Sequence, residues 1–254
     1  MIARPKVGLF VTCLVDLVRP QIGFAAIKLL ERAGCDVGVP VQTCCGQPAW
    51  NSGADRHAAD LARRVIDAFE PFDYVVAPSG SCAGMIKRHY PEIFEGDAAY
   101  GSKTRALAEK THDLLSFLVN VRGMQDVVAE CSGLRACYHD SCSSLREMDV
   151  TDEPRDLLSS VRGLELAELN EPEVCCGFGG LFSVKYPEIS ERMADDKIAD
   201  MQSTGATLVL GADLGCLLHL KGRMQRNGIA MEVRHIAEVL AGMTDDPPLG
   251  AADT

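Results

Sequence analysis

A repeated Cys-Cys-Gly triplet, at residues 44–46 and again at residues 175–177, constrains this chain more than any other feature. An isolated cysteine precedes each triplet by 31 or 33 positions, and another follows the pair by 37 or 40. The two sets are Cys13, Cys44, Cys45 and Cys82, and Cys142, Cys175, Cys176 and Cys216. Equivalent cysteines are 129 to 134 positions apart, close to half of the 254 residues. The repeat therefore predicts two similar halves, each with its own thiol site.

Strand-like and helix-like patterns alternate along both halves. The expected strands are residues 6–12, 36–41, 72–77, 134–139, 164–169 and 207–210. The expected helices are residues 18–33, 54–69, 103–121, 189–203 and 232–240, with another beginning near residue 83. Such alternation predicts an α/β fold in which helices cover parallel sheets. We expect two pseudo-symmetric parallel-sheet domains, residues 1–125 and 126–254, each with one Cys-Cys-Gly motif. Residues 245–254 are expected to form a polar, mobile tail.

The isolated cysteines each follow an expected strand within a few residues. Ligands of parallel sheets bind at the carboxyl ends of strands. The cysteines of one half can therefore meet at one sheet edge, although about 70 positions of sequence separate the first from the last. Three further cysteines, at positions 35, 131 and 137, have no counterpart in the other half and are expected to be structural.

Charge and composition exclude several classes of protein. The net charge of −11 and a pI of about 5.0 argue against nucleic-acid binding, which relies on basic side chains. No apolar run approaches the roughly 20 residues of a membrane span, and the first residues lack a signal-peptide pattern. We therefore expect a cytoplasmic protein. In that reducing compartment, paired cysteines indicate metal or redox chemistry rather than disulfides.

Four thiolates are the usual ligand set of a cubane [4Fe-4S] cluster or of a tetrahedral zinc ion. Adjacent cysteines diverge in extended backbone, but a turn at Gly46 or Gly177 lets both converge. An iron–sulfur site is favoured, zinc is the alternative, and buried structural cysteine is the third reading. A vicinal disulfide would leave the isolated cysteines unexplained.

Longer motifs resemble a known family. The cysteine spacing is similar to that of the cysteine-rich CCG domain family, which includes the CCG-containing component of heterodisulfide reductase and the iron–sulfur component of glycolate oxidase. The strings CCGFGGLFSVKYPEIS at residues 175–190, YHDSC at 138–142 and PSGSCAGM at 78–85 resemble its lactate-utilisation branch. This resemblance covers nearly the whole chain.

The resemblance implies an iron–sulfur electron-transfer subunit of a complex that oxidises L-lactate, or another 2-hydroxy acid, to the keto acid. It implies partners of the lactate-utilisation protein B and C type, through which the chain would also reach a membrane if it does so at all. The eight cysteines would hold one or two [4Fe-4S] clusters, of the cubane type or of the non-cubane type of heterodisulfide reductase.

The chain departs from the wider family at two positions. Where the full motif has Cys-x-x-Cys, this chain has Ser79 before Cys82 and Asp213 before Cys216. Asp213 carries a carboxylate and is therefore an additional candidate ligand, whereas a serine is a poor one. His139, three positions before Cys142, is a candidate hydrogen-bond donor to a cluster. Two alternative functions stay open: a cluster-based disulfide or quinone reductase, and a structural zinc module.

Overall fold

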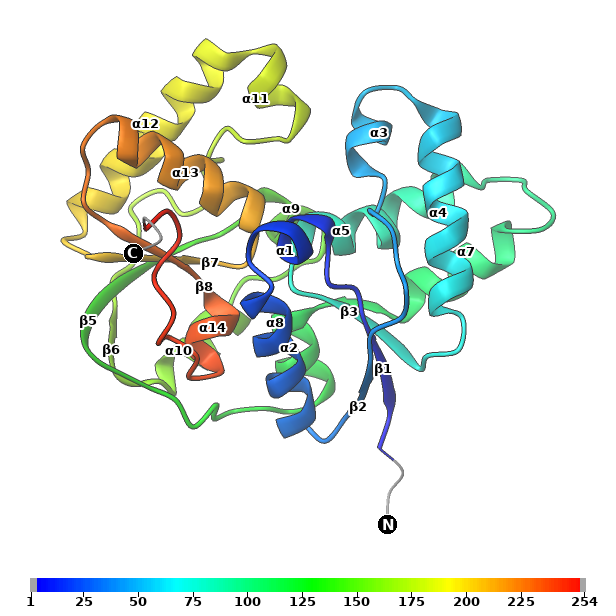
Figure 1. Cartoon of the computed structure of the whole chain (residues 1–254), viewed down its shortest axis with the longest axis horizontal. Coiled ribbons are helices and arrows are strands. Elements are labelled where there is room, and N and C mark those ends of the chain that lie inside the picture. The colour runs from blue at the N-terminus through cyan, green and yellow to red at the C-terminus, as the bar shows by residue number, and fades with distance from the viewer. Residues whose placement is uncertain (1–3, 252–254) are drawn as a thin grey trace.

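Two four-stranded parallel sheets form the framework of the protein, one in each half (Figure 1). The computed structural model describes residues 4–251, apart from the side chain of residue 132. Strand order is β2-β1-β3-β4 in the first sheet and β6-β5-β7-β8 in the second, and every pairing is parallel. The same topology in both sheets confirms the α/β fold with two similar halves.

The elements follow the same course in each half. Those of the first are β1 (Lys6–Leu9), α1 (Cys13–Val18), α2 (Gln21–Arg32), β2 (Asp36–Gly38), α3 (Gln47–Asn51), α4 (Asp55–Phe69), β3 (Tyr74–Ala77), α5 (Gly80–Gly84), the π-helical η1 (Met85–His89), α6 (Tyr90–Ile93), α7 (Gly101–Glu109), β4 (Thr111–Asp113), α8 (Leu114–Ser116) and the π-helical η2 (Phe117–Val121). Those of the second are β5 (Glu130–His139), α9 (Cys142–Glu147), α10 (Glu153–Ser159), β6 (Arg162–Leu166), α11 (Leu181–Lys185), α12 (Pro187–Ser203), β7 (Leu208–Gly211), α13 (Leu214–Arg226), β8 (Glu232–His235) and α14 (Ile236–Leu240).

Two predicted helices were partly wrong, at equivalent places. The helix expected over residues 103–121 is interrupted by β4, which pairs with β3, and the first four residues of the helix expected over 232–240 form β8, which pairs with β7. In both, a short edge strand completes the sheet and runs directly into a helix. Pairing with a neighbouring strand overrides the local helical pattern there. Helix α13, which begins just before Cys216, was not among the expected elements.

The tail packs more closely than expected. The backbone N–H of Leu249 donates to the carbonyl of Val233 at 2.9 Å, and the Leu249 side chain is buried. Arg234 donates to the carbonyl of Asp246 at 2.7 Å. The described part of the tail therefore lies against β8, and residues 252–254 of the predicted mobile segment lie outside the described residues. No helix within residues 4–251 is long and apolar enough to cross a membrane.

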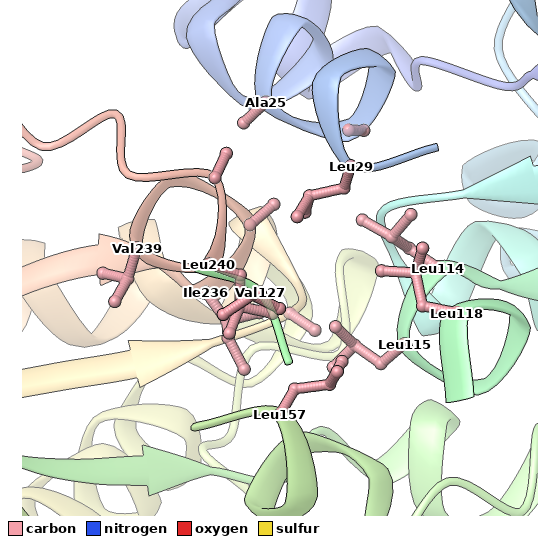
Figure 2. Packing of buried hydrophobic residues seen from close by; sticks show 14 of the residues in the cluster. Ala25, Leu29, Leu114, Leu115, Leu118, Val127, Leu157, Ile236, Val239 and Leu240 are labelled. Carbon is pink, nitrogen blue, oxygen red and sulfur yellow. The ribbon is translucent and has the colours of Figure 1, made fainter. Parts of the chain in front are cut away.

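One hydrophobic core lies between the two halves and takes side chains from both (Figure 2). Side chains from α2 and α8 point toward side chains from α10 and α14, and all are buried. The labelled members are Ala25, Leu29, Leu114, Leu115, Leu118, Val127, Leu157, Ile236, Val239 and Leu240. Burial of one leucine side chain contributes about 1.5–3 kcal/mol, so this shared core stabilises the association of the halves. The expected boundary between residues 125 and 126 falls between η2 and β5 and stays a prediction.

Contacts between the halves are reciprocal. Helix α2 packs against α14, and their counterparts α10 and α8 pack against each other. In the same way α5 packs against α9, and α13 packs against α1. Helices α1, α5 and α9 therefore lie near the centre of the molecule (Figure 1). Each contact between a helix of the first half and a helix of the second thus has an equivalent made by their counterparts. A pseudo-twofold axis between the halves requires this.

A buried ion pair also joins the halves. The Arg19 Nε donates to Glu238 Oε1 at 2.9 Å, and its Nη2 lies 2.8 Å from the same oxygen. The Glu238 side chain has no solvent exposure. Its second oxygen accepts the backbone N–H of His235, which fixes the first turn of α14. Removal of the cation would leave a buried carboxylate without its counter-charge.

We therefore predict that Arg19→Met lowers the free energy of unfolding by about 3–5 kcal/mol. The matched control is Arg192→Met, which removes the same charge from the exposed pair that Arg192 forms with Asp196. Its expected cost is about 0.5 kcal/mol or less. Guanidinium denaturation followed by circular dichroism measures both variants. Equal losses would contradict a stabilising role for the buried pair.

Candidate metal centres

The first four cysteines come together at the carboxyl end of the first sheet. Cys13 begins α1, Cys44 and Cys45 lie in the loop after β2, and Cys82 lies in α5 after β3. The Cys13 thiol donates to Cys44 Sγ at 3.7 Å, and the Cys45 thiol donates to Cys82 Sγ at 3.6 Å. The residues that the sequence grouped from distant positions therefore form one cluster of four thiols.

The second cluster repeats this arrangement. Cys142 begins α9, Cys175 and Cys176 lie in the loop after β6, and Cys216 lies in α13 after β7. Cys142 is within hydrogen-bond reach of Cys175, and Cys176 of Cys216. Each isolated cysteine therefore pairs with one member of the adjacent cysteine pair, as in the first half. The other cysteines, at positions 35, 131 and 137, are buried in hydrophobic cores.

The spacing of the thiols suits a metal. Two thiolates bound to one tetrahedral ion at about 2.3 Å lie roughly 3.8 Å apart. The measured sulfur–sulfur distances of 3.7 and 3.6 Å are close to that value. Thiolates that each bind a different iron of a cubane would lie farther apart. The paired arrangement fits a centre in which one metal ion binds two thiolates.

A glycine turn follows each cysteine pair. Gly46 and Gly177 have φ values of 86° and 85°, in the left-handed region that favours glycine. Their backbone N–H groups point at the first sulfur of the pair, at 3.5 Å from Cys44 and 3.4 Å from Cys175. The turn thus brings both adjacent thiols to one side, as the sequence required, and supplies a hydrogen bond to sulfur.

The crowded sulfurs of each cluster differ in acidity. Hydrogen bonds from the Cys13 thiol and the Gly46 N–H, with the Cys45 thiol close by, lower the pKa of Cys44 to about 2. Donation from Cys142 and Cys176 lowers the pKa of Cys175 to about 2 as well. The same hydrogen bonds raise the pKa of the donors, because a second negative charge nearby is unfavourable. A bound cation removes this repulsion and displaces the remaining protons.

Buried polar contacts hold the cysteine loops. The Tyr90 hydroxyl donates to the Cys45 carbonyl at 2.8 Å, and the tyrosine has no solvent exposure. In the second half, the Arg155 guanidinium donates to both oxygens of Asp140, at 3.0 and 2.9 Å, two positions before Cys142. These loops are fixed by contacts that do not depend on the thiols themselves.

Ser79 and Asp213, which stand three positions before Cys82 and Cys216, contact each other. The Ser79 hydroxyl donates to Asp213 Oδ2 at 2.9 Å, and the Ser81 hydroxyl donates to the same oxygen at 2.6 Å. Oδ1 accepts the Gly215 backbone N–H at 3.1 Å and thereby caps α13. Both oxygens of Asp213 are thus engaged, and its predicted role as a metal ligand would require the loss of these hydrogen bonds.

A cavity borders each thiol cluster, and both halves contribute to its walls. One of about 200 Å³ beside the first cluster is also lined by Phe178 and Gly180 of the second half. Another of about 190 Å³ beside Cys142 and Cys216 is also lined by His89 of the first half. Each thiol cluster therefore borders a cavity whose walls come from both halves.

Two buried polar side chains distinguish the second cluster from the first. His139 is 1% exposed and lies beside Cys176 and Cys216, and burial lowers its pKa to about 3. Lys197 in α12 is also 1% exposed and donates to the carbonyls of Glu171 and Pro172 in the loop before Cys175. Sequence reasoning missed Lys197. A comparison of the two repeats could have found it. At the 131-residue offset between the cysteine pairs, the first half has the apolar Ile66 where the second has this lysine.

Comparison with known proteins agrees with this geometry. The model of the cysteine-rich CCG domain matches residues 7–87 and 136–221, one copy in each half. The chain belongs to the CCG cysteine-rich domain family. Within it, lactate utilization protein A of Geobacillus sp. (strain WCH70) is 50% identical over 236 residues, which cover 92% of this chain and 98% of that protein. Lactate utilization protein A of Bacillus subtilis (strain 168) is 48% identical over the same shares.

A solved structure shares the fold of this CCG protein. The crystal structure of a hypothetical protein from Helicobacter pylori superposes with a TM-score of 0.64 over 96% of this chain and 50% of that one. The two sequences are only 10% identical. This similarity concerns the fold alone.

The second glycine turn of the CCG motifs gives a testable prediction. A Cβ atom at Gly177 would lie 2.7 Å from the Ser190 carbonyl oxygen and 2.8 Å from Met193 Cβ. We expect Gly177→Ala to cost about 2–5 kcal/mol in unfolding free energy, since steric overlap adds to the left-handed strain. The control is Gly205→Ala, where φ is 71° and nothing lies within 4 Å of the added atom.

For Gly205→Ala we expect only the strain of about 1–2 kcal/mol. Chemical denaturation measures stability, and metal analysis per chain reports whether the second cluster still loads. A Gly177→Ala variant as stable as the control would show that the α12 backbone yields at this contact.

Proposed function

We propose that this protein is an iron–sulfur electron-transfer subunit of a complex that oxidises L-lactate to pyruvate. The observation that carries the proposal is the pair of four-thiol clusters, and in the first of them the sulfurs are spaced as on a shared metal ion. The lactate assignment is supported by the relatives named lactate utilization protein A, which match almost end to end. A related 2-hydroxy acid is the nearest alternative substrate of such a complex.

Each residue of the clusters has a definite task. The eight cysteines would bind two clusters, and the Gly46 and Gly177 N–H groups would donate to ligating sulfur. Such hydrogen bonds stabilise the more negative, reduced state and raise its potential. An iron–sulfur cluster supplies one-electron redox chemistry when bound. Oxidation of lactate to pyruvate releases two electrons and two protons, so two one-electron centres match the electron count of one turnover.

The complex would be completed by other subunits. We propose partners of the lactate-utilisation protein B and C type, in the cytoplasm, with electrons passing between their redox centres and the clusters of this chain. The cavities between the halves give such a partner, or a small acceptor, access to both clusters. Contact of the complex with a membrane would then depend on those partners.

Zinc is the second candidate, because sulfur pairs 3.6 and 3.7 Å apart also suit a tetrahedral zinc ion. A structural zinc protein would be colourless, contain no sulfide and have no redox activity. Iron, sulfide and zinc analysis of anaerobically purified protein distinguishes the two. Zinc without sulfide would overturn the electron-transfer proposal.

We predict that Cys45→Ala and Cys176→Ala each remove iron from one half only, so that iron and sulfide fall to about half of the wild-type content. Both side chains are buried within their clusters. The control is Cys35→Ala, which removes a buried thiol of the hydrophobic core and should leave the iron content unchanged. Unchanged iron in both cluster variants would refute the ligand assignment.

A further prediction concerns the carboxylate at position 213. If Asp213 serves mainly as an acceptor for Ser79, Ser81 and the α13 N-terminus, Asp213→Asn retains one acceptor oxygen and should load as much iron as the wild type. Asp213→Ala should load less, because the loop before Cys216 loses its anchor. Iron lost equally in both variants would instead indicate that the carboxylate binds the metal.

A further inference from the structure

The imidazole of His139 has no hydrogen-bond partner among the described residues. Both ring nitrogens are buried and neither makes a protein contact that satisfies it. A neutral imidazole carries one donor and one acceptor, and a buried polar group without a partner costs about 1–3 kcal/mol. Most buried polar groups of folded proteins are satisfied, so an unsatisfied one needs an explanation.

The position of the ring supplies that explanation. A ring nitrogen and the sulfurs of Cys176 and Cys216 all lie within 4.8 Å of one another. Donor atoms on one metal ion, with bonds of about 2.0–2.3 Å, lie roughly 3.5 Å apart, so a small adjustment of the ring suffices. Imidazole nitrogen is a common ligand of iron and zinc, and two histidines replace cysteines on one iron of Rieske clusters.

The first half lacks this group. The residue three positions before Cys13 is Phe10, which is fully buried in the core that contains Cys45 and Cys82. A phenylalanine ring fills the same place beside the first cluster but can neither bind a metal nor donate a hydrogen bond. The repeated fold therefore presents four thiols in one half, and four thiols with an imidazole in the other.

The alternative fifth ligand is otherwise engaged. Asp213 stands where the wider family has a cysteine, but its oxygens accept hydrogen bonds from Ser79, Ser81 and Gly215. His139 is therefore a better candidate than Asp213 for the additional ligand. Its ring nitrogens have no hydrogen-bond partner among the described residues.

We propose that His139 is a metal ligand of the second cluster, which makes the two redox centres chemically different. This inference rests on the proposed function, since it requires an iron–sulfur centre at the second set of cysteines. A neutral imidazole would complete the coordination of the second cluster without adding to the negative charge of its four thiolates.

Pulsed EPR of the reduced full-length protein, purified anaerobically with ¹⁵N-labelled histidine, tests the assignment. We expect a strongly coupled histidine nitrogen, as for a directly bound imidazole. The coupling should persist in Cys45→Ala, which retains the second cluster, and disappear in Cys176→Ala. It should also disappear in His139→Phe, a substitution that copies the residue of the first half. The control is His219→Phe, on the same helix as Cys216, where the ring contacts Ser190 and Phe178.

If the nitrogen coupling is weak, of the strength of a hydrogen bond to sulfide, the ligand assignment is overturned. The proposed function would still be supported in that case by the iron and sulfide contents. Strong coupling that survives His139→Phe would also overturn the ligand assignment. The labelled wild-type protein decides the matter even if that variant fails to fold. Protein that contains no iron and no sulfide would instead refute the proposed function, and the inference with it.

Discussion

Repulsion among four sulfur atoms held in contact is the constraint on which the rest of this structure depends. Several thiolates so close together are not stable without a cation, so the thiols that neighbour Cys44 and Cys175 keep their protons until a metal replaces them. The fold nevertheless holds the sulfurs in place. Tyr90 fixes the loop of the first cysteine pair, Arg155 fixes the approach to Cys142, and both glycine turns direct adjacent side chains to one side. Contacts outside the thiols thus hold the sulfurs in position to bind a metal.

The sequence allowed the clusters to be predicted because their signal is local and repeated. Eight cysteines in two equal patterns, each following a strand, identified the same groups that the structure assembles. The short edge strands β4 and β8 could not be found in this way, because each has only three or four residues and runs into a helix. Their strand geometry comes from pairing with β3 and β7, which is a tertiary effect. The packing of Leu249 was missed for the same reason.

Other features of the site could be recognised only once the arrangement of the two halves in space was known. The hydrogen bonds from Ser79 and Ser81 to Asp213 join positions more than 130 residues apart, and each partner alone resembles an ordinary surface residue. Once the repeat is recognised, however, the differences between its copies become informative. The second half has His139 where the first has Phe10, and Lys197 where the first has Ile66. Nitrogen groups therefore stand in place of buried apolar side chains around the second cluster only. Divergence within the repeat, rather than the repeat itself, distinguishes the two sites.

The reciprocal packing of the halves explains how the two sites can differ. Since α2 meets α14 as α10 meets α8, the contact surface of each half is complementary to its own copy, as in a twofold-symmetric homodimer. A free half would expose the leucines that now meet at the centre of the molecule (Figure 2). A chain of half this length could bury them against a second copy of itself. Because both halves belong to one chain, their equivalent positions are free to differ, and only the second half carries a histidine at the place of Phe10.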